Sequence, residues 1–279
     1  MLDNDFHGNY YTKNGIYKDK YLGQCTSNNA LEFITSLGIG TARSDVYLGA
    51  NFDIIDGVYN KKWMIVAFGY DSTINGNKLY ITLMPRQYAF TLPMNSTNTT
   101  GVSQNELNPL YNDRTDPETG EIIPGTHGVE TRGKQGYYGS DMYQIHLPEI
   151  ANNLSSILGD HLLDNKYLIS DTINLNPQDL NITKTVTNVA WRSAKAILPT
   201  EIQLHGAPVY SIYNDTGNDC SRLPIFNFVP NPQVLLGAGY TWERNVATPS
   251  KFCTTDSHVG AFYKDASDEI RATPLICII

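Results

Sequence analysis

Two stretches near the end of the chain decide the fold: GYTWERNV at residues 239–246 and IRATPLICII at residues 270–279. The second is almost wholly apolar after Pro274, a pattern typical of a strand buried on both faces. We therefore expect the end of the chain to be paired inside the fold. Residues 247–269, between the two stretches, combine Ser, Thr, Asp and Lys with three aromatic residues. That composition predicts a system of displayed loops on a rigid frame.

The composition predicts a strand-rich protein. Only 17% of the 279 residues are charged and 41% are hydrophobic, so Asn, Thr, Ser, Gly and Tyr supply much of the polarity. The 18 Tyr, 22 Gly and 14 Pro favour strands and turns over long helices. The length suits one large domain or two small ones, and it is enough to bury a substantial core.

The charge balance bounds the class of partner. A net charge of −8 and an isoelectric point near 5.2 argue against nucleic acid or an anionic membrane as the partner. No apolar run is long enough to span a bilayer, and residues 1–7 do not resemble a secretory signal. We therefore expect no nucleic acid partner and no membrane insertion.

The cysteines do not have metal-ligand spacing. Four are present, and none forms a Cys-x-x-Cys pair, which argues against a zinc site: Cys25, Cys220, Cys253 and Cys277. We interpret them as free, buried thiols of a protein made in a reducing cytoplasm, with a disulfide as the alternative. The sequence predicts no metal and no cofactor.

The first third of the chain predicts an arm followed by a helix and several strands. Residues 1–15 are expected to form an N-terminal arm and residues 16–23 a short strand. A helix is expected over Asn28 to Leu37, capped by Thr26 or Ser27, with Leu31, Ile34 and Phe33 facing inward. Strands at 46–54 and 62–68 flank Asp56-Gly57, a hairpin signal, and a third strand is expected at 78–84.

Residues 101–136 resemble an insertion in this pattern. They contain a turn sequence at 116–121 and four acidic residues that could form a calcium loop: Asp113, Asp116, Glu118 and Glu121. Their spacing departs from that of an EF-hand loop, so we favour a solvated hairpin.

One longer helix is predicted to begin near Ser140 and to end at Gly159. Apolar residues recur there at helical spacing, and we expect Met142 and Leu154 to belong to the core. Pro148 either kinks this helix or starts a second one. Residues 167–170 lead into a strand, and residues 175–187 are expected to form a loop or an edge strand.

The sequence offers little that resembles an active site. The six histidines are scattered, and there is neither a His-Glu-x-x-His nor a Gly-x-Ser-x-Gly motif. Acidic residues such as Asp265, Asp268 and Glu269 could serve a glycosidase, but solvated loop carboxylates are the favoured interpretation. We therefore predict that the protein is not an enzyme.

Several motifs along the chain, taken in their order, resemble those of a family of tailed-bacteriophage tail, baseplate and fibre proteins. The resemblance runs from residue 16 to the end, interrupted by residues 101–136, and rests on Tyr17–Gly23, Val46–Gly49, Trp63–Phe68, Leu83–Pro85, Pro93–Thr100, Gly139–Met142, Leu198, Glu201, Gly206, Trp242, Arg244, Arg271 and Pro274. Trp242-Glu243-Arg244 stands where the family has Trp-Leu-Arg, and residues 270–274 replace its Gly-Val-Arg-Pro.

The resemblance implies a C-type-lectin-like α+β fold over residues 16–279, β-rich, with a short N-terminal helix, one longer helix and long loops. It implies a structural protein of a phage virion, assembled in the host cytoplasm, forming homo-oligomers and contacting other virion proteins. Its lectin-like domain would recognise a host-surface glycan or protein. A purely architectural subunit, such as a head fibre or decoration protein, is the alternative, and a cell-wall glycan hydrolase is a weaker one.

The resemblance does not imply calcium-dependent sugar binding. The ligand motifs of calcium-dependent lectins have no counterpart at 229–232 or 242–245, and a lectin-like fold does not by itself imply sugar binding. At Glu201 we expect a structural carboxylate that bonds backbone at the start of a helix. Five residues are expected to form the structural frame: Trp63, Trp242, Arg244, Arg271 and Pro274.

The candidate recognition surface is the polar and aromatic segment near the C-terminus. Tyr, Ser, Thr and His on a rigid scaffold make adaptable contacts at low entropic cost. The predicted receptor-binding residues are Thr254, Thr255, Asp256, Ser257, His258, Phe262, Tyr263 and Lys264. The alternative is that these residues form ordinary solvent loops or contact a neighbouring virion subunit.

Overall fold

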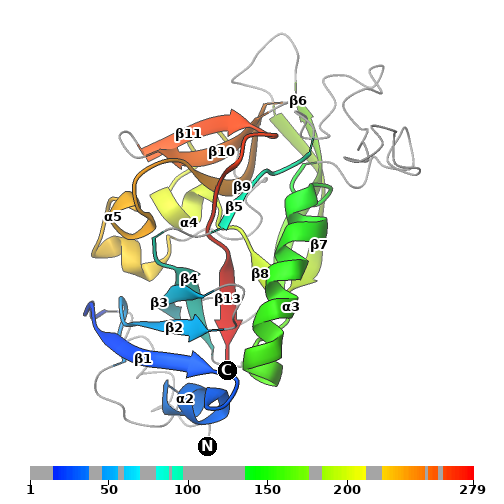
Figure 1. Ribbon diagram of the computed structural model, residues 1–279. Coiled ribbons are helices and arrows are strands. Elements are labelled where there is room, and N and C mark those ends of the chain that lie inside the picture. Colours follow the sequence, from blue (N-terminus) through cyan, green and yellow to red (C-terminus); the bar gives the residue numbers. More distant parts are fainter. Residues whose placement is uncertain are drawn as a thin grey trace, which may run out of the picture.

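The computed structural model has a mixed α+β architecture with few helices and several sheets, and it is rich in strands, as the composition predicts (Figure 1). It describes residues 15–37, 46–55, 60–69, 80–87, 90–96, 136–175, 184–211, 222–248, 251–256 and 260–279. The predicted N-terminal arm and the predicted insertion lie outside these residues, apart from Gly15 and Gly136. Among the described helices, none has the length and apolarity needed to cross a membrane.

The larger sheet has six strands in the order β1-β2-β3-β4-β13-β8. They are β1 (Tyr21–Thr26), β2 (Asn51–Ile55), β3 (Lys61–Phe68), β4 (Ile81–Pro85), β13 (Leu275–Ile278) and β8 (Ala196–Ile197). Strand β13 is buried along its length between β4 and β8, which confirms the predicted buried terminal strand. Strands β2 and β3 pair antiparallel, as the Asp-Gly signal predicts, although the turn itself lies outside the described residues.

The second sheet has five strands in the order β11-β10-β9-β12-β5. They are β11 (Gly260–Asp265), β10 (Lys251–Asp256), β9 (Thr241–Thr248), β12 (Ile270–Ala272) and β5 (Phe90–Leu92). The prediction of displayed loops over 247–269 is therefore wrong for residues 251–256 and 260–265. Their Thr, Phe and Tyr residues are good strand formers, and the buried Thr255 hydroxyl finds a hydrogen-bond acceptor in Glu243.

Helix α2 (Ala30–Leu37) begins two residues later than predicted. Ile34 is buried as expected, but Leu31 is 67% exposed, so its prediction as an inward residue is wrong. The side chain of Asn29, the residue before the helix, accepts a hydrogen bond from the backbone N–H of Thr26 at 2.7 Å. This hydrogen bond ties Thr26, one of the two predicted cap residues, to the residue that precedes the helix.

The longer helical segment starts with a π-helical turn, η3 (Met142–His146), and continues as α3 (Leu147–Leu158). Pro148 lies in the first turn of α3, directly after the π-helical turn, so the helical segment changes from π to α at the proline. Gly159 ends α3 as predicted, and the short helix η4 (Gly159–His161) follows it. Met142 and Leu154 have no exposed surface, which confirms them as core residues.

A single cluster of buried apolar side chains joins the two sheets and α3, and α3 packs against β8 and α2. A separate two-stranded ribbon is formed by β6 (Asn165–Leu175) and β7 (Lys184–Ala194). Residues 184–187 belong to β7, an edge strand, which was one of the two alternatives for that region. The remaining described helices are α4 (Glu201–His205), η6 (Pro224–Asn227) and α5 (Gln233–Leu236).

The predicted frame residues occupy interior positions, apart from Arg271, which is partly exposed. Trp63 and Trp242 have no exposed surface, and the Trp242 indole N–H donates to the carbonyl oxygen of Leu92 at 2.8 Å, which joins β9 to β5. The Arg271 guanidinium would lie 3.4 Å from a Cβ at Gly239, whose φ of +109° favours glycine. A side chain at residue 239 would therefore push against Arg271.

Candidate functional site

Helix α4 positions the polar residues of the site, and a capping box between Thr200 and Gln203 fixes the start of the helix. The backbone N–H of Gln203 donates to the Thr200 hydroxyl at 3.1 Å, and the backbone N–H of Thr200 donates to the Gln203 side chain at 2.8 Å. The segment Leu-Pro-Thr-Glu at residues 198–201 predicts such a start, since Thr is a favoured N-cap residue and Gln follows it at N3. Glu201, the residue that follows the Thr200 cap, is thereby held inside the protein.

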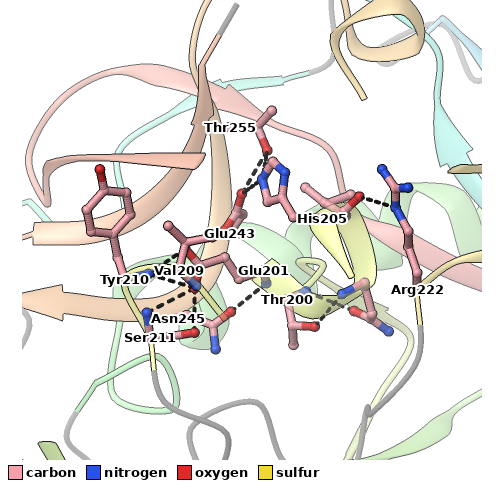
Figure 2. A network of polar contacts seen from close by, with 12 residues as sticks. Thr200, Glu201, His205, Val209, Tyr210, Ser211, Arg222, Glu243, Asn245 and Thr255 are labelled. Atoms are coloured by element: carbon pink, nitrogen blue, oxygen red, sulfur yellow. Dashed lines mark hydrogen bonds and ion pairs between the residues drawn. The ribbon is translucent and has the colours of Figure 1, made fainter. Parts of the chain in front are cut away.

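The Glu201 carboxylate holds the loop that follows α4 (Figure 2). It is fully buried and accepts hydrogen bonds from the backbone N–H groups of Val209, Tyr210 and Ser211, each at 2.9 Å. It also accepts one from the Ser211 hydroxyl at 2.6 Å. The prediction that Glu201 bonds backbone is confirmed, but its donors belong to the loop eight to ten residues later, not to the helix start. We call residues 206–211 the latched loop.

A second buried carboxylate, Glu243 of β9, meets His205 of α4 and Thr255 of β10. One carboxylate oxygen, Oε1, accepts from the Thr255 hydroxyl at 2.7 Å and lies 3.0 Å from His205 Nε2. The other oxygen, Oε2, has no hydrogen-bond partner among the described residues. Burial raises the pKa of Glu243 above its ordinary value, against the opposing effects of His205 and Thr255.

The geometry of these three residues is not that of a nucleophilic triad. In a triad the histidine uses one ring nitrogen for the nucleophile and the other for the carboxylate. Here the same nitrogen, His205 Nε2, lies 3.2 Å from the Thr255 hydroxyl and 3.0 Å from Glu243 Oε1. Thr255 is also fully buried. The contacts therefore join α4, β9 and β10 and expose no nucleophile.

One group of described side chains is close enough together to hold a cation. One ligand atom each from Glu201, Glu243 and Cys253 lies within 4.8 Å of the other two, and all three residues are buried. In a tetrahedral zinc site the ligand atoms lie about 2.0–2.3 Å from the metal. The ligand atoms of such a zinc site are therefore about 3.3–3.8 Å from one another. Because Glu201 already accepts the hydrogen bonds of the latched loop, we assign this group to packing and not to metal binding.

Four aromatic side chains gather at the β11 edge of the five-stranded sheet. The ring centroids of Tyr210 and Tyr263 lie 5.1 Å apart, those of Tyr240 and Phe262 lie 5.6 Å apart, and those of Phe262 and Tyr263 lie 5.2 Å apart. All four residues are partly exposed. They come from the latched loop, the residue before β9, and β11. We call these four residues, with Lys251 and Lys264, the aromatic platform.

Each lysine of the aromatic platform lies over one of its rings. Lys264 Nζ is 4.1 Å from the Tyr240 ring centroid, and Lys251 Nζ is 5.1 Å from that of Tyr263. Lys251 also forms an ion pair with Asp265 at 3.5 Å. The cations thus stack on the electron-rich faces of the rings, an interaction worth about 0.5–1 kcal/mol at exposed sites.

The structure separates the predicted receptor-binding residues into two groups. Phe262, Tyr263 and Lys264 are partly exposed and come together in the aromatic platform. Thr254 and Thr255 have no exposed surface and Asp256 is 9% exposed, so the expectation that these three lie on a displayed loop is wrong. Ser257 and His258 lie outside the described residues.

The prediction missed Tyr210, Tyr240 and Lys251. Tyr240 and Lys251 stand close in sequence to the predicted segment, and a rule extending the site to neighbouring aromatic and basic residues would include them. No local signal marks Tyr210, which reaches Tyr263 only because Glu201 fixes the latched loop. Comparisons with protein-family models, with curated proteins and with solved structures find no match for this chain.

Proposed function

We propose that this chain is a structural protein of a tailed-bacteriophage virion, at the tail, baseplate or a fibre. It displays a C-type-lectin-like domain and contacts the host surface through the aromatic platform. The observation that carries the proposal is the gathering of partly exposed rings and lysines on one sheet edge. The order of the phage-family motifs supplies the virion context, and the strand-rich α+β architecture is compatible with a lectin-like fold.

The aromatic platform has properties that favour recognition. Tyr and Phe bury a large contact area at low entropic cost, since each has only two side-chain torsions. Two of the rings stand on β11, and the latched loop that carries a third is held by a buried carboxylate. Groups that are fixed before binding lose less entropy on binding, so this surface is preorganised.

A homo-oligomer fits this proposal. A surface of four rings makes a weak contact, and several copies on one particle raise the overall affinity by increasing the effective concentration of the second contact. Phage appendages built from identical subunits have closed symmetry, which presents every copy of the platform in an equivalent position.

The proposal is tested by binding of the purified full chain to intact cells from a panel of bacterial species. Tyr263→Ala removes one platform ring, and Trp191→Ala is the matched control, because Trp191 is 50% exposed on β7, outside the five-stranded sheet. We expect the wild type and Trp191→Ala to bind cells of at least one species, and Tyr263→Ala to bind roughly tenfold more weakly, a loss of about 1.4 kcal/mol. Equal binding by both variants, or no binding by the wild type, would contradict recognition through the platform.

A purely architectural subunit is the second candidate, and the position of β11 favours it. Among the described strands β11 pairs only with β10, so it lies at an edge of the described sheet, the position at which a strand from a neighbouring subunit would pair. A structure of the assembled particle distinguishes the two candidates. The platform is exposed to solvent if it recognises the host, and it is covered by another subunit if the chain is architectural.

We propose no enzymatic activity. The described acidic residues of the site are committed to internal hydrogen bonds, and the Glu243 group exposes no nucleophile. Turnover of cell-wall glycan by the purified chain, abolished by the substitution of one acidic residue, would overturn this part of the proposal.

A further inference from the structure

The aromatic platform carries positive charge on a protein whose formal net charge is −8. Lys251 is balanced by Asp265, but Lys264 forms no ion pair within the described part of the chain. The ammonium group of Lys264 is instead held over the Tyr240 ring. Its charge therefore lies against the Tyr240 ring and is not neutralised by a carboxylate of the described residues.

The rings and this lysine suit different parts of one ligand. The face of an aromatic ring carries partial negative charge, so it attracts the slightly positive C–H groups that cover one face of a sugar ring. An ammonium group donates charge-assisted hydrogen bonds to a carboxylate or phosphate. A sugar that bears an anionic group can make both contacts at once.

We propose that the aromatic platform binds an anionic glycan, with a sugar ring against the partly exposed surface of the stacked Phe262 and Tyr263 pair and a carboxylate or phosphate on Lys264. The inference rests on the proposed function, because it names the ligand class of the same surface. The ratio of groups favours a glycan over an acidic peptide. The aromatic platform has four rings and one ammonium group without an ion pair among the described residues, which matches a repeat with one anionic group per sugar, whereas a run of acidic side chains requires several cations.

The test is titration calorimetry of the full chain with defined probes. An oligogalacturonate carries one carboxylate per ring, and a phosphorylated dextran carries phosphate. A malto-oligosaccharide is the neutral control, and poly-glutamate represents the acidic peptide. We expect the chain to bind at least one anionic glycan about tenfold more tightly than the neutral one, a difference of about 1.4 kcal/mol. The anionic glycan that binds more tightly shows whether the charged group of the ligand is a carboxylate or a phosphate.

Two matched variants link this binding to Lys264. Lys264→Gln removes the charge and keeps a polar side chain, and we expect it to bind the anionic glycan about as weakly as the neutral one. Lys166→Gln, at an exposed position on β6, is expected to retain the preference. Added salt is expected to weaken the wild-type binding, because the contact with Lys264 is partly screened.

Several results would overturn the inference. These are equal affinity for neutral and anionic glycans, an unchanged preference in Lys264→Gln, binding of poly-glutamate as tight as that of the glycans, or no binding of any probe. The proposed function fails separately. Cell binding that depends on Tyr263 but not on Lys264 leaves host recognition in place and removes the anionic glycan. Binding of an anionic glycan without binding of cells leaves the ligand class in place and removes host recognition.

Discussion

The two sheets of this protein solve the problem of burial in opposite ways. In the six-stranded sheet, β4 and β13 are buried throughout and β3 is buried from Trp63 onward, with mostly apolar side chains. The five-stranded sheet buries a row of polar side chains: Thr241, Glu243, Arg244, Asn245, Thr254, Thr255 and Asp256. Apolar burial is non-directional, whereas buried polar groups must find hydrogen bonds of defined geometry.

The difference shows which sheet supplies most of the stability and which one positions the residues of the aromatic platform. The apolar sheet can repack after a small change, but the polar sheet has one arrangement in which Glu201, Glu243 and Thr255 find their partners. This arrangement also places Tyr210 against Tyr263. Substitutions in the first sheet should therefore lower the free energy of unfolding, and substitutions beneath the second should also displace the aromatic platform.

The largest expected effect is that of Trp63→Ala in the apolar sheet. Trp63 has no exposed surface, and replacing a buried aromatic residue by alanine costs about 3–5 kcal/mol. Urea unfolding should show this loss, while the fraction that remains folded keeps the cell binding of the wild type. Leu31→Ala, at a position that is 67% exposed, is the control and should change stability by less than about 0.5 kcal/mol. A comparable loss in both variants would contradict the assignment of stability to the apolar sheet.

A smaller loss of stability, with a clear effect on position, is expected for Glu201→Gln. The amide has one acceptor oxygen for the donors of the latched loop and places its NH₂ group among them, so about 1–3 kcal/mol should be lost. Hydrogen exchange at the amides of residues 209–211 should quicken, because they lose their acceptor. Glu269→Gln, at an exposed position, is the control. Unchanged exchange in Glu201→Gln would show that the latch does not hold the loop.

The sequence predicts the apolar sheet better than the polar one, for a physical reason. An unbroken apolar run such as residues 275–278 has one favourable environment, so β13 was predicted correctly, and Pro148 and Gly159 mark the helix between them by local geometry. Thr254 and Thr255 have no such signature. A threonine in a strand suits solvent or a buried hydrogen bond equally well, and the two residues that Thr255 contacts, Glu243 and His205, lie 12 and 50 residues away.

The same reasoning explains why the candidate site was only partly predicted. Phe262, Tyr263 and Lys264 were found because they are adjacent in the sequence. Tyr210 was not found, because its position depends on a contact between Glu201 and a loop that the sequence does not mark. Composition predicts the strand-rich class of the fold, whereas the hydrogen bonds that assemble a surface from distant segments appear only in the structure.

A third prediction tests the helix that carries both Glu201 and His205. Thr200→Ala removes the N-cap of α4, and the expected loss in the free energy of unfolding is about 1 kcal/mol. Thr200→Ser restores the hydroxyl and should recover most of that loss. If serine behaves like alanine, the lost methyl group matters more than the cap, and the polar sheet would resemble the apolar one at this position.

The smallest expected effect concerns pH and Glu243. Burial raises the pKa of this carboxyl above its ordinary value of 4.5, although His205 and Thr255 act in the opposite direction. The folded state therefore favours the protonated form. Protonation contributes stability that is fully present below pH 4.5 and is lost as the pH rises through the raised pKa.

Glu243→Gln cannot titrate at this position, so it isolates that contribution. The free energy of unfolding of the wild type, minus that of the variant, should fall as the pH rises from about 4 to about 7, because only the wild type must bury a charge at the higher pH. Because His205 Nε2 lies 3.0 Å from Glu243 Oε1, the comparison is repeated with His205→Gln in both proteins. A difference that does not change with pH in that background would mean that Glu243 has the same pKa folded and unfolded. The buried carboxyl would then cost the polar sheet no more than an exposed one, and the contrast between the two sheets would lose its electrostatic part.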